Sequence, residues 1–196
     1  MRQVRGAIIG AGFVFFLAGS AAAQEKGLEF NAFAGAYAPT RTEGLQGTLE
    51  AVRRGSLAYG GRVTFWGASA LGFEATGVFS PARIRVTARS GNQFARSTGF
   101  LGGAAKLMFN LTPRSTGLGI ALGAGPAAIH TFETVANPDA STTDVGGVGG
   151  LALRLNVGEN VALRGDVEDW FYNGNFGRGG KLTHDFVLSA GLSIRF

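Results

Sequence analysis

The 196-residue chain has no cysteine, only five prolines and only two histidines. Without cysteine it forms neither disulfides nor thiolate metal sites. Charged residues make up 16% of the chain and aromatic residues 11%, a balance that argues against intrinsic disorder. The 33 glycines follow no three-residue period, which excludes a collagen-like chain. The sequence therefore predicts a folded chain of ordinary single-domain length.

The formal net charge is +5, but two of the positive charges, Arg2 and Arg5, precede an uncharged apolar segment. The remaining arginines are scattered along the chain instead of being massed on one element. This distribution gives little support to nucleic-acid binding. We expect neither a nucleic-acid partner nor a cofactor.

The first 23 residues have the three-part layout of a secretory signal. MRQVR is basic, GAIIGAGFVFFLAGS is apolar, and SAAAQE places Ala21 and Ala23 before Gln24. We therefore expect residues 1–23 to be a cleaved signal peptide and residues 24–196 to form one domain. An uncleaved anchor helix is the alternative. No later stretch is long and apolar enough for a membrane helix, so a mature chain that spans a membrane must be a closed barrel.

Apolar residues alternate with polar or small residues through the mature chain. Because successive side chains of a strand point to opposite faces, this period predicts strands with one apolar face. It recurs in eight segments, residues 28–38, 56–66, 70–80, 98–111, 117–130, 145–157, 161–172 and 182–196. Segments of this length and pattern are typical of transmembrane strands. The predicted fold class is all-β, an eight-stranded antiparallel up-and-down transmembrane β-barrel.

The connections between these segments alternate in length. The turns at 67–69, 112–116 and 158–160 are short, whereas the loops at 39–55, 81–97, 131–144 and 173–181 are mostly longer. Outer-membrane barrels keep short turns on the periplasmic side and longer loops outside. We therefore expect the long loops to face the cell exterior. Alternation within 81–97 further predicts a hairpin that extends past the membrane and turns near residues 90–92.

Aromatic residues lie near both ends of the predicted strands, as interfacial girdles do. The periplasmic group is Phe30, Phe65, Trp66, Phe109 and Phe196, and the outer group is Tyr37, Tyr59, Phe79, Phe132, Phe171, Tyr172 and Phe186. Tyr37 and Trp66 depart from the pattern, because parity turns them inward.

The polar face of the strands carries seven charged residues, Arg62, Glu74, Lys106, Arg154, Arg164, Asp166 and Glu168. We predict that they form an ion-pair network inside the lumen. The turn at 67–69 predicts Arg62 opposite Glu74. The turn at 158–160 predicts Arg154 opposite Arg164, with Asp166 one diagonal step away. Asp169 has outward parity, which places it at or above the outer headgroups.

An eight-stranded barrel is only wide enough to be filled by its own side chains, so we expect a plugged lumen. The alternative is a narrow wet channel, to which inward glycines would contribute. These glycines are Gly60, Gly72, Gly123, Gly125 and Gly150.

The mature chain resembles the small outer-membrane β-barrel family that includes the OmpA transmembrane domain and the OmpX-like proteins. The resemblance rests on the signal segment ending AAAQ and on the stretches EFNAFAGAYAP, YGGRVTFW, LRGDVEDW and GLSIRF. It implies a monomer in the outer membrane of a Gram-negative bacterium, exported through the periplasm. In that family, a C-terminal aromatic residue with alternating apolar residues is recognised by the outer-membrane assembly machinery. The resemblance gives this role to Leu192, Ile194 and Phe196.

Some barrels of this size are enzymes that edit lipid A with a His and a Ser two residues apart. Here His130 is followed by Thr131 and Phe132, and His184 by Asp185 and Phe186, so neither has that serine. We expect no catalytic residue. The third loop contains Glu133, Asp139 and Asp144, whose spacing predicts no metal site.

The second loop contains four arginines, Arg83, Arg85, Arg89 and Arg96. Guanidinium groups suit lipopolysaccharide phosphates, although an ordinary solvated loop explains the same residues. We expect a structural or surface-interaction role: envelope integrity, lipopolysaccharide binding or contact with a host or the environment. A narrow solute channel is the alternative, and an enzyme acting on outer-leaflet lipid is the third hypothesis.

Overall fold

The computed structural model describes residues 27–40, 42–45, 49–67, 70–81, 83–88, 93–97, 99–113, 117–132, 141–174 and 181–196. The expected signal peptide lies outside these ranges, as do Arg89, Glu133 and Asp139. Among the described residues, no helix is long and apolar enough to cross a membrane.

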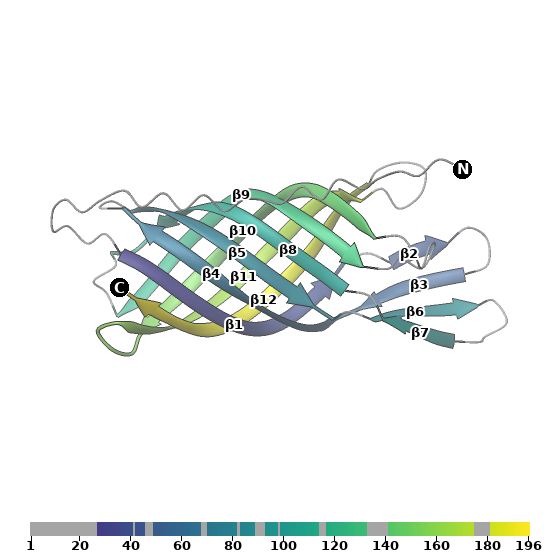
Figure 1. Ribbon diagram of the computed structural model, residues 1–196, viewed down its shortest axis with the longest axis horizontal. Coiled ribbons are helices and arrows are strands. Elements are labelled where there is room, and N and C mark those ends of the chain that lie inside the picture. Colours follow the sequence, from purple (N-terminus) through teal and green to yellow (C-terminus); the bar gives the residue numbers. More distant parts are fainter. Residues whose placement is uncertain are drawn as a thin grey trace, which may run out of the picture.

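Eight strands close into an antiparallel barrel in the order β1-β12-β11-β10-β9-β8-β5-β4, and β4 pairs with β1 to complete the ring (Figure 1). The strands are β1 (Gly27–Pro39), β4 (Ser56–Trp66), β5 (Leu71–Ser80), β8 (Gly99–Asn110), β9 (Leu118–Phe132), β10 (Thr142–Asn156), β11 (Val161–Gly174) and β12 (Lys181–Arg195). Their bounds lie within a few residues of the predicted segments. The predicted fold class is confirmed.

A second sheet extends the barrel at the end opposite to the C-terminus (Figure 1). Its strands are β2 (Thr42–Leu45), β3 (Leu49–Arg54), β6 (Arg83–Ala88) and β7 (Gln93–Ser97), paired in the order β2-β3-β6-β7. The hairpin predicted within 81–97 is confirmed by the pairing of β6 with β7. The expectation that 39–55 is a loop is wrong, because β2 and β3 prolong β1 and β4 beyond the barrel.

Strand alternation separates an apolar outer surface from an enclosed lumen. On β12, Leu188 is 59% exposed, whereas its neighbour Val187 is fully buried. The same contrast recurs around the ring, with outward leucines such as Leu57 and Leu107 more than 60% exposed. A water-soluble protein seldom displays so large a continuous apolar surface, whereas a lipid-facing barrel requires one. The outer wall is therefore the lipid-facing surface.

Most predicted girdle residues lie on that outer wall, but three of the predicted girdle residues point inward. Tyr37 and Trp66 are buried in the lumen, as their parity indicates. The placement of Tyr172 in the outer girdle is wrong, because this residue is 1% exposed and lies inside. Its neighbour Phe171, at 38% exposure, takes the outward position.

The register between β4 and β5 differs from the prediction. Arg62 lies opposite Thr76, and Glu74 lies opposite Thr64. The hairpin closes with the Gly67 amide donating to the Leu71 carbonyl at 3.0 Å, which moves every cross-strand partner by two residues relative to a tighter turn. Between β10 and β11, Arg154 does lie opposite Arg164, as that turn length predicts.

Candidate functional site

The middle of the lumen holds three cations and three carboxylates from four strands. The cluster consists of Arg62, Lys106, Arg164, Glu74, Asp166 and Glu168, and each side chain is almost completely buried. We call these six residues the lumen cluster. Their formal charges balance, which is required where water is excluded and an unpaired charge is costly.

Glu74 accepts from two cations on different strands. Its Oε1 lies 2.7 Å from Lys106 Nζ, and its Oε2 lies 2.6 Å from Arg164 Nη1. The hydroxyls of Thr64 and Thr76 also donate to this carboxylate, at 2.6 and 3.3 Å. Charge-assisted bonds of this length are among the stronger hydrogen bonds in proteins. Glu74 therefore links opposite parts of the wall through its two oxygens.

Arg62 connects β4 to the far side of the ring. Its Nη1 lies 3.3 Å from Asp166 Oδ2, and its Nη2 lies 3.3 Å from Glu168 Oε2. The ring of Phe33 stacks on the guanidinium, with the carbon centre 3.9 Å from the ring centroid. Arg62 and Glu74 are 3.8 Å apart, so they meet diagonally and not as the directly opposed pair that the sequence predicted.

The other two cations of the lumen cluster, Arg164 and Lys106, also form ion pairs within it. Arg164 donates to both oxygens of Asp166 on its own strand, with Nη2–Oδ1 at 2.7 Å. Lys106 pairs with Glu168 as well as with Glu74. All six members of the cluster are thus joined in one continuous chain of ion pairs.

Arg154 forms a separate pair nearer to the C-terminal end of the barrel. Its Nη1 lies 3.2 Å from Glu29 Oε2, and the Trp66 indole donates to the same oxygen at 3.3 Å. Sequence reasoning did not include Glu29, although the outward parity of Leu28 and Phe30 places Glu29 on the inner face. Asp166 lies one diagonal step from Arg154, as predicted, and it pairs with Arg62 and Arg164.

A layer of aromatic and apolar side chains lies in the lumen on the side of the second sheet. It contains Phe33, Tyr37, Ala58, Val78, Phe100, Ala127, Ile129, Val148, Trp170, Tyr172 and Val187. Tyr37 stacks on Phe100, and Phe100 meets Trp170 edge to face at a centroid distance of 5.9 Å. The hydroxyls of Tyr37 and Tyr172 both donate to Asp185 Oδ2, at 2.7 and 2.8 Å. We call this the aromatic layer.

Four of the five inward glycines lie against neighbouring side chains, whereas Gly125 lies against the backbone of Ala105. A Cβ on Gly72 would lie 2.5 Å from the Trp66 ring, one on Gly150 would lie 3.1 Å from Glu168 Cγ, and one on Gly123 would overlap the sulfur of Met108. The cavity beside Glu29, Trp66 and Arg154 has a volume of about 20 Å³, room for about one water molecule. The glycines therefore accommodate large neighbours at these positions.

The two histidines lie near the end of the barrel that carries the second sheet, and they have different partners. His184 Nδ1 lies 2.9 Å from Asp169 Oδ2, and His130 Nδ1 lies 2.8 Å from the Thr143 hydroxyl. Both contacts join neighbouring strands and were missed from the sequence. A hydrolytic triad needs one histidine to contact both a hydroxyl and a carboxylate. Here the hydroxyl and the carboxylate belong to different histidines. In the described ranges, no three His, Asp or Glu side chains gather as a metal site.

The second sheet brings several arginine positions together. Arg83 on β6 lies opposite Arg54 on β3, and Ile84 lies opposite both Arg53 and Arg96. Arg83 and Arg85 alternate on one strand and so occupy equivalent register positions. The structure thus places the strand-borne arginines of the predicted lipopolysaccharide contact in one small sheet.

The last residues of the chain join the ends of the barrel wall. The Phe196 amide donates to the Leu28 carbonyl at 2.9 Å, and the Phe196 and Phe30 rings meet edge to face at 5.8 Å. Leu192 and Ile194 are outward and exposed. The predicted assembly signal therefore lies on the lipid-facing side of the closing strand pair β1–β12.

Neither a protein-family model nor a curated protein sequence matches the chain. Solved structures do. The outer membrane protein OprG from Pseudomonas aeruginosa aligns with a TM-score of 0.66 at 15% identity, covering 88% of this chain and 96% of its own. Neisserial surface protein A aligns at 0.55 and 13% identity, covering 85% and 97%, and the N-terminal β-barrel domain of Pseudomonas aeruginosa OprF at 0.53 and 12%, covering 87% and 97%. The chain has the fold of the small eight-stranded outer-membrane β-barrels, and its apolar outer wall makes it an integral barrel protein of that membrane.

Proposed function

We propose that this protein is a closed, non-conducting outer-membrane barrel that supports the envelope and contacts lipopolysaccharide through its second sheet. The observation that carries the proposal is the filling of the lumen. The lumen cluster ties opposite walls together, and the aromatic layer covers it toward the second sheet. An ion crossing this path would have to displace buried ion pairs and pass a layer of buried aromatic side chains.

Planar-bilayer recording tests the closed lumen directly. Purified protein, shown to be inserted by its folded migration on unheated gels, is expected to give no steady current. The double variant Phe100→Ala/Trp170→Ala removes the core of the aromatic layer and serves as a comparison. Steady conductance through the unaltered protein would contradict the proposal and favour the narrow solute channel.

The second sheet is the part of the protein suited to anionic partners. Residues 40–55 and 81–98 contain seven arginines against two glutamates, whereas the remainder of the mature chain is slightly acidic. Clustered guanidinium groups bind phosphates with good geometry and raise the local concentration of anions. Lipopolysaccharide phosphates are the anions that outward-facing loops meet first.

Lipopolysaccharide binding is tested with Arg83→Gln/Arg85→Gln/Arg96→Gln. This variant should bind lipopolysaccharide micelles more weakly than the unaltered protein, and the difference should shrink as salt rises. Arg114→Gln, in the expected periplasmic turn, is the control and should bind normally. Equal binding by the triple variant would remove lipopolysaccharide contact from the proposal.

Catalysis is the candidate that we place last. The Asp169–His184 pair resembles the carboxylate–imidazole half of a triad, and this is the observation in its favour. We propose that the protein is not an enzyme, because the hydroxyl contact belongs to His130. Mass spectra of outer-leaflet lipids from cells with and without the protein should coincide. A lipid product that depends on His184 would establish the enzyme instead.

The last part of the proposal concerns assembly of the barrel into the outer membrane. Leu192, Ile194 and Phe196 would be read by the outer-membrane assembly machinery, and the protein would act as a monomer exported through the periplasm. The exposed apolar face of β12 and the pairing of Phe196 with β1 support this role.

A further inference from the structure

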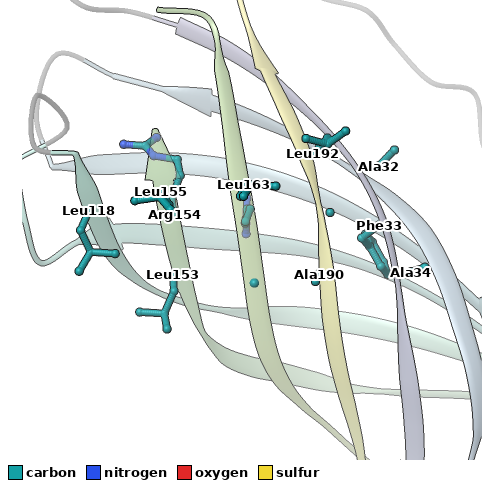
Figure 2. Close-up of a pocket in the computed structure, with 13 residues that line it drawn as sticks. Ala32, Phe33, Ala34, Leu118, Leu153, Arg154, Leu155, Leu163, Ala190 and Leu192 are labelled. Carbon is teal, nitrogen blue, oxygen red and sulfur yellow. The ribbon is translucent and has the colours of Figure 1, made fainter. Parts of the chain in front are cut away.

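The lipid-facing wall is hollowed across β9, β10, β11, β12 and β1. The hollow has a volume of about 760 Å³, within the range of about 300–1,000 Å³ typical of small-molecule sites. Figure 2 shows Leu118 and Leu153 on one side, Ala32 and Ala34 on the other, and Ala190 between them.

The register explains the shape of the hollow. Gly165 on β11, Ala190 on β12 and Ala34 on β1 lie directly opposite one another, so three adjacent strands present their smallest outward residues in one row. The next row toward the C-terminal end is built from Leu155, Leu163 and Leu192. On β10, Leu153 lies opposite Gly165 and ends the floor on that side. A floor of small residues is thus bounded by the leucine row and by Leu153.

The hollow offers apolar side chains to a ligand. Leu153, Leu163 and Leu192 are each about half exposed on its walls. Arg154 and Arg164 also border it, but their guanidinium groups point into the lumen, where they pair with Glu29 and Glu74. A ligand in this place needs no hydrogen bonds and must be flexible enough to follow a curved wall. A hydrocarbon chain meets both conditions.

We propose that this hollow is a specific seat for an acyl chain of a glycerophospholipid from the periplasmic leaflet. It lies in the half of the barrel nearest to the short turns and the C-terminus. Leu192 precedes the end of β12 by only three residues, and Leu163 follows the start of β11 by two. With the long loops outward, this half faces the phospholipid leaflet and not the lipopolysaccharide leaflet. The proposal does not depend on whether the lumen conducts.

The contacts that the hollow offers are apolar. Arg195 at the end of β12 lies opposite the inward Glu29 and therefore on the lumen face, where its Nη2 donates to Asn156 Oδ1 at 3.1 Å and to the Glu159 carbonyl at 3.3 Å. The hollow therefore receives the hydrocarbon chain and not the headgroup.

A second copy of this chain fits the hollow less well. A two-fold interface brings the same surface of both partners together, so the surface must complement itself. Two concave floors placed face to face would leave a gap, whereas one hydrocarbon chain fills a groove. The hydrophobic effect does not hold the chain, since bulk lipid tails are equally apolar. Retention comes from packing contacts that a flat wall does not provide.

The test uses two matched pairs of substitutions on the lipid-facing wall. Gly165→Leu/Ala190→Leu fills the floor of the hollow, and a Cβ at Gly165 meets nothing nearer than 3.7 Å. Gly77→Leu/Gly103→Leu adds comparable bulk at another directly opposed pair, where a Cβ meets nothing within 4 Å. Each protein is purified in mild detergent, checked for folded migration, and analysed for bound lipid by native mass spectrometry.

The unaltered protein and the Gly77/Gly103 variant should retain one phospholipid per barrel after detergent exchange. The Gly165/Ala190 variant should retain about tenfold less, the scale expected for packing contacts inside a membrane. Equal retention by all three proteins, or no retained phospholipid, would overturn the proposal. Retained lipopolysaccharide would overturn the leaflet assignment, and a dimer that the filled variant abolishes would replace the lipid with a second copy.

Discussion

Arg164 and Glu74 lie on diametrically opposite strands of the eight-stranded ring, β11 and β5, and yet their Nη1 and Oε2 atoms are 2.6 Å apart. This bond crosses the full width of the lumen. It holds the two walls at a fixed separation and, with the ion pairs of Lys106 and Arg62, spans the middle of the barrel. The stability of the barrel should therefore depend on these central charges.

Removing the Glu74 carboxylate tests that dependence. Glu74→Ala leaves Lys106 and Arg164 with one carboxylate fewer in a dry site, so we expect a loss of about 3–5 kcal/mol in the free energy of unfolding. Urea unfolding in lipid vesicles, followed by gel migration, measures it. Glu159→Ala, on an exposed turn, should change the free energy by less than about 0.5 kcal/mol.

Charge balance can be separated from simple side-chain loss. Glu74→Ala/Lys106→Met removes one charge of each sign, so its destabilisation should be smaller than the sum of the two single effects. A strictly additive result would show that Lys106 and Glu74 act independently, contrary to their 2.7 Å contact.

The aromatic layer predicts that alanine substitutions at two neighbouring residues lower the free energy of unfolding by clearly different amounts. Trp170 is fully buried in the lumen, whereas Phe171 faces lipid. Trp170→Ala should cost about 3–5 kcal/mol, because it opens a large cavity in the aromatic layer. Phe171→Ala should cost clearly less, since lipid can fill the space it vacates. Similar unfolding midpoints for the two variants would contradict the assignment of their faces.

The carboxylate of Asp185 depends on two phenols. Tyr172→Phe removes one hydrogen bond to Oδ2 while keeping the ring, so we expect a loss of about 1.5–3 kcal/mol. Tyr37→Phe should act similarly through the same oxygen. Tyr59→Phe, on the lipid-facing wall, is the matched control and should leave the unfolding midpoint unchanged. An equal effect at Tyr59 would mean that losing a tyrosine hydroxyl destabilises the barrel whether or not that hydroxyl contacts Asp185.

The C-terminal residue should affect assembly more than stability. Phe196→Ala loses the edge-to-face contact with Phe30 but leaves the backbone bond to Leu28 available. We expect much less folded protein in outer-membrane fractions, while refolding of the purified chain into vesicles continues. Normal amounts in cells would show that Phe196 is not part of the assembly signal. Leu57→Ala, another exposed apolar residue of the wall, controls for loss of lipid contact.

The period of two in the sequence is enough to predict all eight barrel strands and the face on which each charged residue lies. It works because lipid outside and an enclosed lumen inside impose opposite requirements on alternate residues. Glu29 satisfied the same rule and was overlooked, although Leu28 and Phe30 flank it with apolar side chains. Tyr172 was placed outward on its aromatic character when its parity pointed inward.

Partnerships across the lumen were beyond sequence reasoning. Turn length predicts direct cross-strand neighbours, as for Arg154 and Arg164, but an error of one residue in the turn centre displaced Arg62 from Glu74. The bond between Arg164 and Glu74 depends on ring closure and on the stagger of the strands, which no local pattern contains. The second sheet was missed in part because β2 and β3 are short and lack regular alternation.

Among the described residues, the second sheet extends from β1, β4, β5 and β8, which form one half of the ring. A strand of six residues, such as β6, spans about 20 Å. A large molecule approaching from outside would touch this basic ledge well before it reached the lipid, and it would do so from one preferred side. The basic sheet therefore favours one orientation of an approaching anionic molecule relative to the barrel.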